Sequence, residues 1–204
     1  MSKSEGIGAS VRRTEDFRLL AGHGRYVGNI VLPGELRCHV VRSPHAHARI
    51  RAVRAGRAAA QPGVVAVFTG HDMAADGVGP MRSLWEIRSR DGQPMAEPPR
   101  WALARDSVRH VGEPVAVVIA ETPEAAVDAA EQLEVDYAEL PAVTASRDAL
   151  REGAPRLHEE APGNVCFRWA RGDAAAVRDA FESAAHVTRI DLVEFWDQSI
   201  ADSR

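Results

Sequence analysis

An unbroken apolar run at residues 115–119 lies near the middle of the chain, between two groups of turn-forming residues. Short β-branched runs bounded by turn signals are typical of a strand that is buried on both faces. Gly112 permits a tight turn before the run, and Pro114 can open a strand because its missing N–H precedes the ladder. The pattern predicts a central strand that is entered through this turn.

A helix and a second strand are predicted directly after this strand. Thr122 is a candidate N-cap, Pro123 suits the first helical position, and Glu124 faces the positive end of the helix dipole. Residues 133–137 then alternate apolar and acidic side chains, as in a strand with one wet face. The resulting strand–helix–strand unit is predicted to be the centre of the fold.

Other periodic segments predict short elements on both sides of this unit. A helical turn capped by Thr14 is expected to direct Phe17 and Leu20 inward. Residues 45–53 alternate between a basic face and an apolar face. Strands are predicted over 36–42, 45–53, 64–69, 165–169 and 186–193, and helices over 55–61, 146–150 and 174–184.

Two stretches lack periodicity and are predicted to be irregular. Residues 74–100 contain several prolines and glycines, which predicts a long surface excursion of the kind that often contacts partners. Trp85 and Trp101 are expected to anchor its two ends. Proline and glycine also mark residues 153–164 as a connector. Together these elements predict an α/β (α+β) fold with a mixed sheet and short flanking helices.

Composition indicates an ordinary globular protein. The chain has 204 residues, of which 45% are hydrophobic and 26% charged. No apolar run approaches the roughly 18 residues that a membrane span requires. The first residues lack the apolar core of a secretion signal, so the expected location is cytoplasmic.

Charge is unevenly distributed along the chain. Residues 1–57 hold 11 Lys and Arg against 4 Asp and Glu, whereas the rest holds 14 against 25. A basic segment can bind nucleic acid, but these arginines are dispersed and few aromatic residues lie between them to stack bases. A solvated face, or an interface with an acidic neighbour, is the favoured interpretation.

Several residues were weighed as candidates for chemistry. Cys38 and Cys166 have no CxxC companion and are expected to be small buried hydrophobes, with a disulfide or a reactive thiol as alternatives. Two cysteines alone cannot hold an iron–sulfur cluster, which usually needs four. Gly22 and Gly24 form a weak phosphate-cradle pattern, because no buried strand precedes them and no helix clearly follows.

Histidines and carboxylates give equally weak signals. His45 and His47 would share a strand face and could hold a metal ion, but zinc needs three or four protein ligands and no further ligand lies nearby in sequence. Glu159 and Glu160 are adjacent, so their side chains diverge. Glu113 lies beside a turn and a buried strand, where a carboxylate can have a raised pKa and act as a base.

Eight segments, in this order, resemble the large, molybdopterin-binding subunit of the molybdenum hydroxylases, the family of xanthine dehydrogenase, aldehyde oxidase and aerobic carbon monoxide dehydrogenase. The resemblance covers about residues 11–193. The matching segments are RTED (13–16), LAGHGRY (20–26), LPG (32–34), RSPHAHARI (42–50), PGVVAVFTG (62–70), VGEPVA (111–116), EVDYAELPAV (134–143) and HEEAPGNV (158–165).

This resemblance implies an a/b hammerhead fold followed by the start of a molybdenum-binding portion. Family members hydroxylate aldehydes or N-heterocycles with water as the oxygen source, or oxidise carbon monoxide. Molybdopterin cytosine dinucleotide takes the electrons, which pass to a small subunit with two [2Fe–2S] clusters and to a medium FAD subunit. The resemblance does not separate these substrates.

The family's catalytic and cofactor-binding residues lie downstream of the matched segments. The expectation is therefore that this chain supplies no catalytic, cofactor-binding or metal-binding residue and binds no cofactor by itself. Glu113 is then expected to be architectural, because the family's base lies elsewhere. The family pattern also stops at about residue 193, which suggests a truncated or frameshifted gene.

The implied organisation is a flexible tail at 1–10, a hammerhead domain at 11–150, a connector with the start of the molybdenum-binding portion at 151–193, and an atypical tail at 194–204. The favoured function is a structural part of a molybdopterin-dependent oxidoreductase that is inactive alone. One alternative is a free-standing binding or subunit-interaction module. Another is a self-sufficient enzyme that uses His45 and His47, or the Glu159 and Glu160 region.

Overall fold

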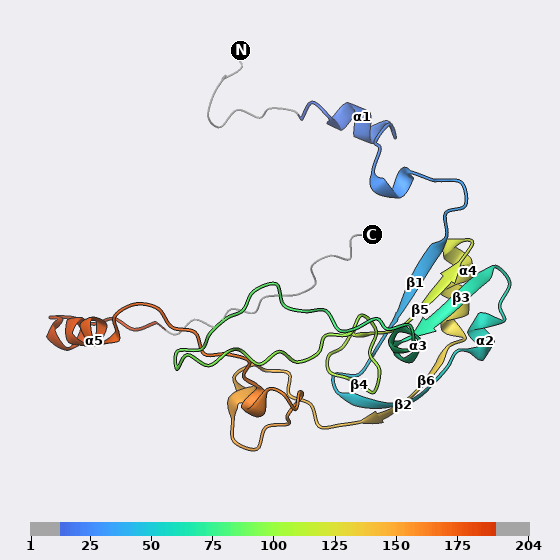
Figure 1. The fold of residues 1–204 in the computed structure, drawn as a ribbon. Helices are drawn as coiled ribbons and strands as arrows, with labels where there is room; N and C mark the ends of the chain where they lie inside the picture. The colour runs from blue at the N-terminus through green and yellow to red at the C-terminus, as the bar shows by residue number, and fades with distance from the viewer. Residues whose placement is uncertain (1–12, 191–204) are drawn as a thin grey trace, which may run out of the picture. The chain divides into compact units, whose positions relative to one another are not determined.

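The computed structural model describes residues 13–190, so the expected tails at 1–10 and 194–204 lie outside the described residues. The described residues form two compact units. Unit 1 comprises residues 13–83 and 97–164, and unit 2 comprises residues 84–96 and 165–190. Figure 1 shows the elements of each unit.

The first sheet of unit 1 is built around the predicted central strand. Strand β5 (Pro114–Ala120) lies between β1 (Arg37–Arg42) and β3 (Val64–Thr69), and both pairings are antiparallel. Helix α4 (Pro123–Glu131) packs against β1 and β5, beside the short helix α2 (Gly56–Ala59). The predicted caps are confirmed, because Thr122 Oγ1 accepts a hydrogen bond from the Ala125 N–H at 3.1 Å and Pro123 opens the helix.

The second sheet has β2 (Ala48–Arg54) between β4 (Ser107–Val108) and β6 (Glu134–Glu139). The predicted alternation of β2 is confirmed at its start, where Ala48 and Ile50 are buried and Arg49 and Arg51 are exposed. The buried residues of this sheet join strand β5 to form the core of unit 1. That core consists of Ala48, Ile50, Ala104, Val108 and Val115.

The expected α/β class is confirmed, with antiparallel sheets in place of the expected mixed sheet. Every strand pair among residues 13–190 is antiparallel, and the strands fall into two sheets. The strand–helix–strand unit β5–α4–β6 therefore links the two sheets. The physical reason is that β1 and β3 occupy both edges of β5, so β6 cannot pair beside β5 and pairs with β2 in the second sheet.

The N-terminal helix α1 (Asp16–Leu20) differs from its prediction. Phe17 is 84% exposed and Leu20 is 88% exposed, so neither side chain faces inward. The N-cap is Glu15 and makes no side-chain capping bond, in place of the predicted Thr14. A helix of five residues gains most of its stability from packing, and no residue of α1 is buried among the described residues. A 3₁₀ turn, η1 (Val27–Asn29), follows before β1.

One helix was not predicted. Helix α3 (Gly70–Ala75) follows β3, and its capping box pairs Thr69 Oγ1 with the Asp72 N–H and the Asp72 carboxylate with the Thr69 N–H. The Thr-x-x-Asp pattern that signals this helix start is present in the sequence, at the end of the strand predicted over 64–69. Hydrogen bonds to Thr69 keep the pKa of the Asp72 carboxyl below its usual value.

The excursion at 74–100 is largely irregular, as predicted, with bridges between Met81 and Arg100 and between Arg88 and Pro94. Trp85 is 79% exposed and does not anchor it, which corrects the prediction. Trp101 is partly buried, with the Arg105 guanidinium 4.8 Å from its ring centre. The predicted helix at 146–150 is a 3₁₀ turn, η2 (Asp148–Leu150), and the connector contains another, η3 (Pro162–Asn164).

Unit 2 contains few regular elements. The predicted strand at 165–169 is wrong: the segment is held by isolated bonds, in which the Ala96 N–H donates to Cys166 O at 2.8 Å and the Arg90 N–H to Arg168 O at 2.7 Å. Helix α5 (Ala174–Ser183) confirms the predicted helix, and its N-cap Asp173 accepts hydrogen bonds from the Ala175 and Ala176 N–H groups. Residues 186–190 of the last predicted strand form no strand, and 191–193 lie outside the described residues.

Candidate functional site

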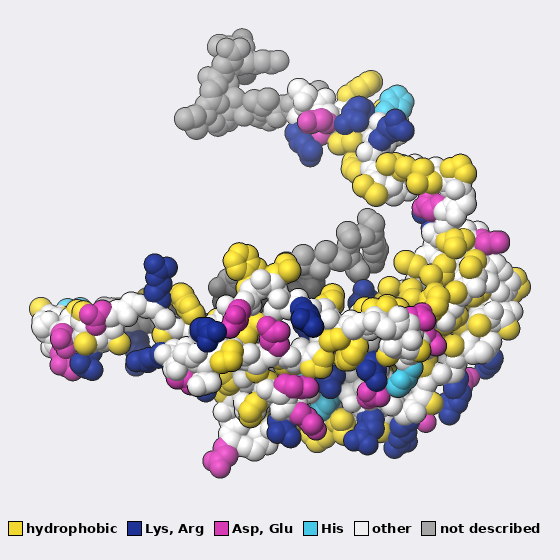
Figure 2. Space-filling view, viewed as in Figure 1, with side chains coloured by type: hydrophobic (Ala, Val, Ile, Leu, Met, Phe, Trp, Pro, Cys, Tyr) yellow, Lys and Arg dark blue, Asp and Glu magenta, His cyan; other side chains and the backbone are white. Residues whose placement is uncertain are grey.

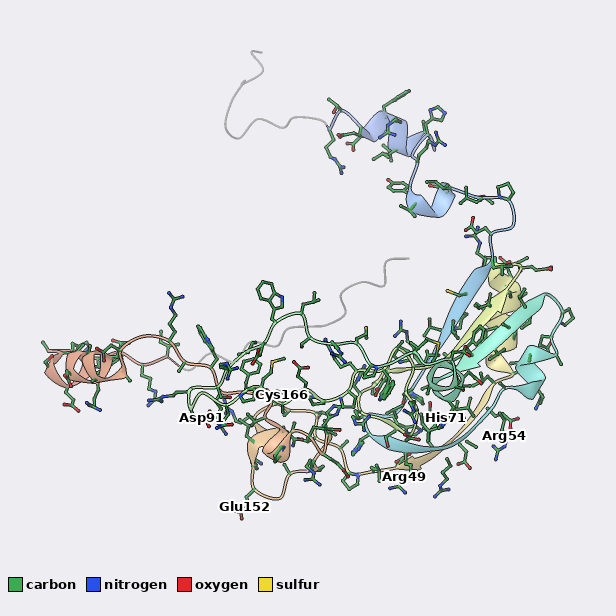
Figure 3. All side chains as sticks on the ribbon, viewed as in Figure 1. Arg49, Arg54, His71, Asp91, Glu152 and Cys166 are labelled. Carbon is green, nitrogen blue, oxygen red and sulfur yellow. The ribbon has the colours of Figure 1, made fainter. Side chains whose placement is uncertain are left out.

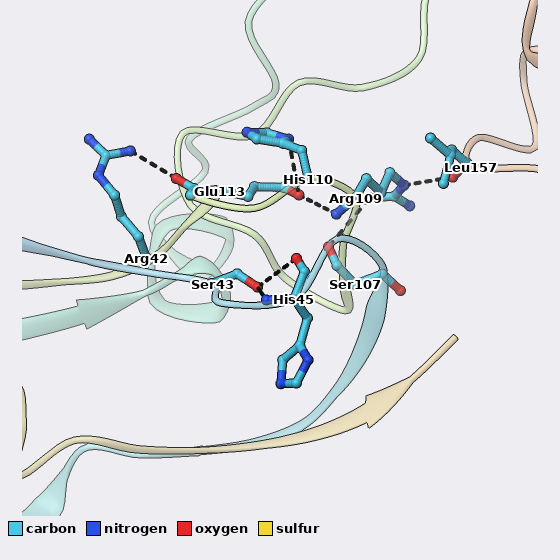
Figure 4. A network of polar contacts seen from close by, with 9 residues as sticks. Arg42, Ser43, His45, Ser107, Arg109, His110, Glu113 and Leu157 are labelled. Atoms are coloured by element: carbon cyan, nitrogen blue, oxygen red, sulfur yellow. Dashed lines mark hydrogen bonds and ion pairs between the residues drawn. The ribbon is translucent and has the colours of Figure 1, made fainter. Parts of the chain in front are cut away.

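The turn before β5, at residues 109–114, carries most of the polar contacts near the centre of unit 1 (Figure 4). Gly112 has φ +86°, a left-handed conformation that favours glycine. Its N–H donates to Ser43 O at 2.8 Å, and the Ser43 N–H donates to Glu113 O at 2.9 Å. Arg42 Nη1 donates to Gly112 O at 2.9 Å. These bonds attach the turn to the end of β1.

The Glu113 carboxylate acts within this turn. Its Oε2 accepts a hydrogen bond from the Arg109 N–H and lies 3.6 Å from His110 Nδ1. The side chain is 18% exposed. A buried backbone N–H that lost this acceptor would carry a desolvation penalty, so the carboxylate stabilises the turn. The geometry therefore indicates a structural role for Glu113 in this turn.

Arg109 connects the turn to the connector. Its Nε donates to Leu157 O at 2.8 Å, and Nη1 lies 3.4 Å from Ser107 O. Asn164 then fixes the connector by accepting from the Leu157 N–H at 3.0 Å and donating to Ala149 O and Pro155 O. One arginine side chain therefore holds together segments that are far apart in the sequence.

His45 and His47 are each engaged in different contacts. The His45 ring packs edge-on to Tyr137 at 4.8 Å, and its Nδ1 lies 3.5 Å from Glu139 Oε1. His47 Nδ1 lies 2.7 Å from Pro141 O and donates a hydrogen bond to this carbonyl in the tautomer that carries the proton on Nδ1. Among residues 13–190 no three His, Cys, Asp or Glu side chains are grouped as metal ligands.

His158 is the residue of this region that sequence reasoning did not single out. Its Nδ1 is buried and has no hydrogen-bond partner among the described residues. Burial, and then the positive charge of Arg109, lower the pKa of His158, while Glu160 and Glu113 oppose this shift. Burial also raises the pKa of Tyr137. No local pattern identifies His158, because its burial arises from the docking of the connector.

The other candidates do not join this cluster. Glu159 and Glu160 are both exposed. The Gly22–Gly24 stretch follows helix α1, so no helix N-terminus stands directly behind it as a phosphate cradle would need. A shallow cleft of about 380 Å³ is lined by residues 142–145, 148 and 151–155, and its Asp148 and Arg151 pair with each other at 2.9 Å.

The two cysteines correct the expectation of burial. Both are free thiols, and both are exposed. Cys38 lies on β1, an edge strand of the first sheet, and Cys166 belongs to unit 2. An edge strand has a neighbour on one side only, which leaves its side chains more accessible than those of β5.

Comparison with known proteins identifies this two-sheet fold. Residues 21–141 match the family described as aldehyde oxidase and xanthine dehydrogenase, a/b hammerhead domain. The match and the fold therefore define an a/b hammerhead domain. The chain belongs to the aldehyde oxidase and xanthine dehydrogenase family and carries its hammerhead domain.

Similar proteins are large subunits of much greater length. The chain is 38% identical over 181 residues to the nicotine 6-hydroxylase large subunit of Paenarthrobacter nicotinovorans, covering 89% of this chain and 21% of that protein. It is 36% identical over 182 residues to the carbon monoxide dehydrogenase large chain of Hydrogenophaga pseudoflava, covering 83% and 21%. The chain thus spans about a fifth of the length of these relatives.

Two solved structures also resemble this chain over about a fifth of their own length. Quinoline 2-oxidoreductase from Pseudomonas putida 86 superposes with a TM-score of 0.69 at 41% identity, covering 90% of this chain and 22% of that one. Cu,Mo-CO dehydrogenase also superposes with a TM-score of 0.69, at 33% identity. In the part of the chain that the structure describes, no helix has the length and apolarity to cross a membrane.

Proposed function

We propose that this chain is the amino-terminal, structural portion of the large subunit of a molybdopterin-dependent oxidoreductase. The observation that carries the proposal is that this chain, which matches the hammerhead model over residues 21–141, aligns with only about a fifth of longer large subunits. The proposed organisation keeps a hammerhead domain at 11–150 and a connector with the start of the molybdenum-binding portion at 151–193. The proposed location is the cytoplasm.

The polar groups of the turn at 109–114 do not favour a molybdopterin site there. A pterin needs unpaired donors and acceptors, whereas Ser43, Arg109 and Glu113 already bond to other parts of unit 1. We therefore place the cofactor on the remainder of the large subunit and assign no catalytic, cofactor-binding or metal-binding residue to this chain.

The proposed partners are a medium FAD subunit and a small [2Fe–2S] subunit. The names of the relatives support a multisubunit assembly, since one is a "large subunit", one a "large chain" and one a "complex subunit gamma". Candidate contact surfaces are the basic face of β2, where Arg49 and Arg54 are exposed on its outer side (Figure 3), and the excursion at 74–100.

A chimera tests this function. Residues 13–190 replace the aligned segment of the Hydrogenophaga pseudoflava large chain, which is expressed with its partner subunits. The chimera is expected to bind molybdenum and to co-purify with both partners, whereas the 204-residue chain alone binds no molybdenum by elemental analysis. Stoichiometric molybdenum on the isolated chain, or a folded chimera that recovers no partner, would contradict the proposal.

One observation favours the alternative of a free-standing interaction module. On α5, Val177 is 56% exposed and Phe181 is 62% exposed, so the helix presents an apolar face within unit 2. Exposed apolar faces of this kind promote association. A stable monomer whose melting temperature rises with an added ligand would support this alternative over the structural portion.

A further inference from the structure

Strand β5 is apolar on both faces, but only one face is fully buried. Ala116, Val118 and Ala120 have no exposed surface, and α4 covers this side of the sheet. Val117 and Ile119 point to the opposite face and are partly exposed. Antiparallel sheets with one wet face normally place polar side chains there. The sequence of β5 therefore suits a strand that is covered on both faces, but unit 1 covers the second face only in part.

Two rows of paired residues define this opposite face, called here the open face. Residues paired directly across antiparallel strands lie on the same side of a sheet. In the first row Ile119 pairs with Cys38 and Ala66, and in the second Val117 pairs with Val40 and Phe68. None of the six side chains is charged. All six keep some exposed surface, and hydrophobic side chains gather over β1, β5 and β3 in Figure 2.

The composition of the open face resembles a core more than a transient interface. Non-obligate interfaces are about as polar as the rest of a protein surface, whereas surfaces buried permanently are more apolar. A contiguous apolar patch on a soluble protein marks an interaction site. The covering element is therefore one that is always present when the protein is assembled.

We propose that the open face docks against the remaining portion of the same large subunit, beyond the hammerhead. This inference rests on the proposed function, which makes the chain about a fifth of a longer subunit. That remainder would be permanently linked to the hammerhead in one chain. A permanent neighbour is the kind of occupant that an uncharged, core-like surface requires. A second copy of this chain and a partner subunit are the other occupants that the test distinguishes.

Cys38 provides a natural probe because it is exposed and lies on the open face. Iodoacetamide labelling is measured by peptide mass spectrometry in the isolated 204-residue chain and in the Hydrogenophaga pseudoflava chimera without its partner subunits. Cys38 is expected to react readily in the isolated chain and on the order of tenfold more slowly in the chimera, because docking removes access to the thiol. Cys166 serves as the internal reference.

A charged substitution tests the same face. Cys38→Arg is expected to leave the melting temperature of the isolated chain unchanged, because the side chain is exposed there, and to lower that of the chimera or make it insoluble. The matched control is Cys166→Arg, an exposed cysteine of unit 2. This control is expected to leave the chimera folded.

The outcomes separate the inference from the proposed function. Equal labelling of Cys38 in both proteins, together with a C38R chimera as stable as its parent, overturns the docking while the proposed function stands. Protection of Cys38 in a dimeric isolated chain assigns the face to a second copy, and protection only after the partner subunits are added assigns it to them; either result overturns the inference. A chimera with unaltered residues 13–190 that does not fold overturns both.

Discussion

At the scale of single residues, close backbone approaches and buried polar atoms determine which positions are sensitive. Gly70 is buried at the start of α3, and a Cβ built there would lie 2.4 Å from Ala104 O. Gly56, at the start of α2, has nothing within 4 Å of such a Cβ. The two glycines therefore have the same helical position but different surroundings.

Gly70→Ala is expected to lower the free energy of unfolding by about 2 kcal/mol, because the residues around Ala104 must shift to admit the methyl group. Gly56→Ala is the matched control and is expected to change stability by about 0.5 kcal/mol or less, in the stabilising direction. Urea unfolding of both variants measures the difference. Equal stability of the two variants would show that the close approach of Ala104 to Gly70 does not determine the cost of the Gly70 substitution.

His158 gives the stability of unit 1 a defined pH dependence. Its pKa in the folded chain lies below the ordinary value of 6.5, first because of burial and then because of Arg109. The unfolded chain therefore takes up the proton first as the pH falls. The contribution of the neutral His158 side chain to stability is present above about pH 6.5. It is lost as the pH falls from 6.5 towards the lower pKa of the folded chain.

Replacing this histidine should reduce that dependence. His158→Gln is expected to lose less stability than the parent chain between about pH 7.5 and about pH 5.5, because glutamine does not titrate. Urea unfolding at the two pH values provides the comparison. His23→Gln, at an exposed position, is the control for the substitution itself. A His158→Gln variant with the parental pH dependence would rule out the buried imidazole as its source.

At the scale of elements, strands and caps with strong local signals were predicted correctly. The β5 run, the Thr122 cap and the alternation of β2 are all encoded within a few neighbouring residues. The division into two sheets was not predicted, because it depends on which strands occupy the edges of β5. Strand β4 was missed since its two residues have no periodicity. The contacts of Ser43 and Arg109 were missed for the same reason as the sheet division: their partners are distant in sequence.

The N-cap of α4 gives the prediction at this scale. Thr122→Ala removes the acceptor of the Ala125 N–H and is expected to lower the free energy of unfolding by about 1 kcal/mol. Thr122→Ser keeps the hydroxyl and serves as the control. Chemical denaturation monitored by circular dichroism provides the measurement. Similar stability of the alanine variant and the parent chain would mean that this helix start does not depend on its cap.

At the scale of the whole molecule, the chain divides into units that are not contiguous in sequence. Unit 2 is formed where residues 165–168 bond to residues 89–96. Unit 1 holds both sheets and the core residues. Removal of residues 165–204 should therefore affect the two units differently.

A chain ending at residue 164 is expected to unfold cooperatively with the urea midpoint of unit 1 unchanged. The Ala96 and Arg90 amides lose Cys166 O and Arg168 O as acceptors, so their hydrogen exchange should accelerate. The Ile50 amide, which donates to Asp106 O in unit 1, is the control and should keep its protection. Loss of cooperative unfolding in the shortened chain would show that unit 1 is not independent.

The position of β5 between β1 and β3 also determines when the first sheet can form during synthesis. Val40 of β1 and Phe68 of β3 both pair with Val117, so neither strand has its ladder partner until β5 has left the ribosome. Closing such long loops is entropically costly and slows folding. Until then the apolar strands β1 and β3 are exposed on the nascent chain, and this interval is when they are most accessible to chaperones.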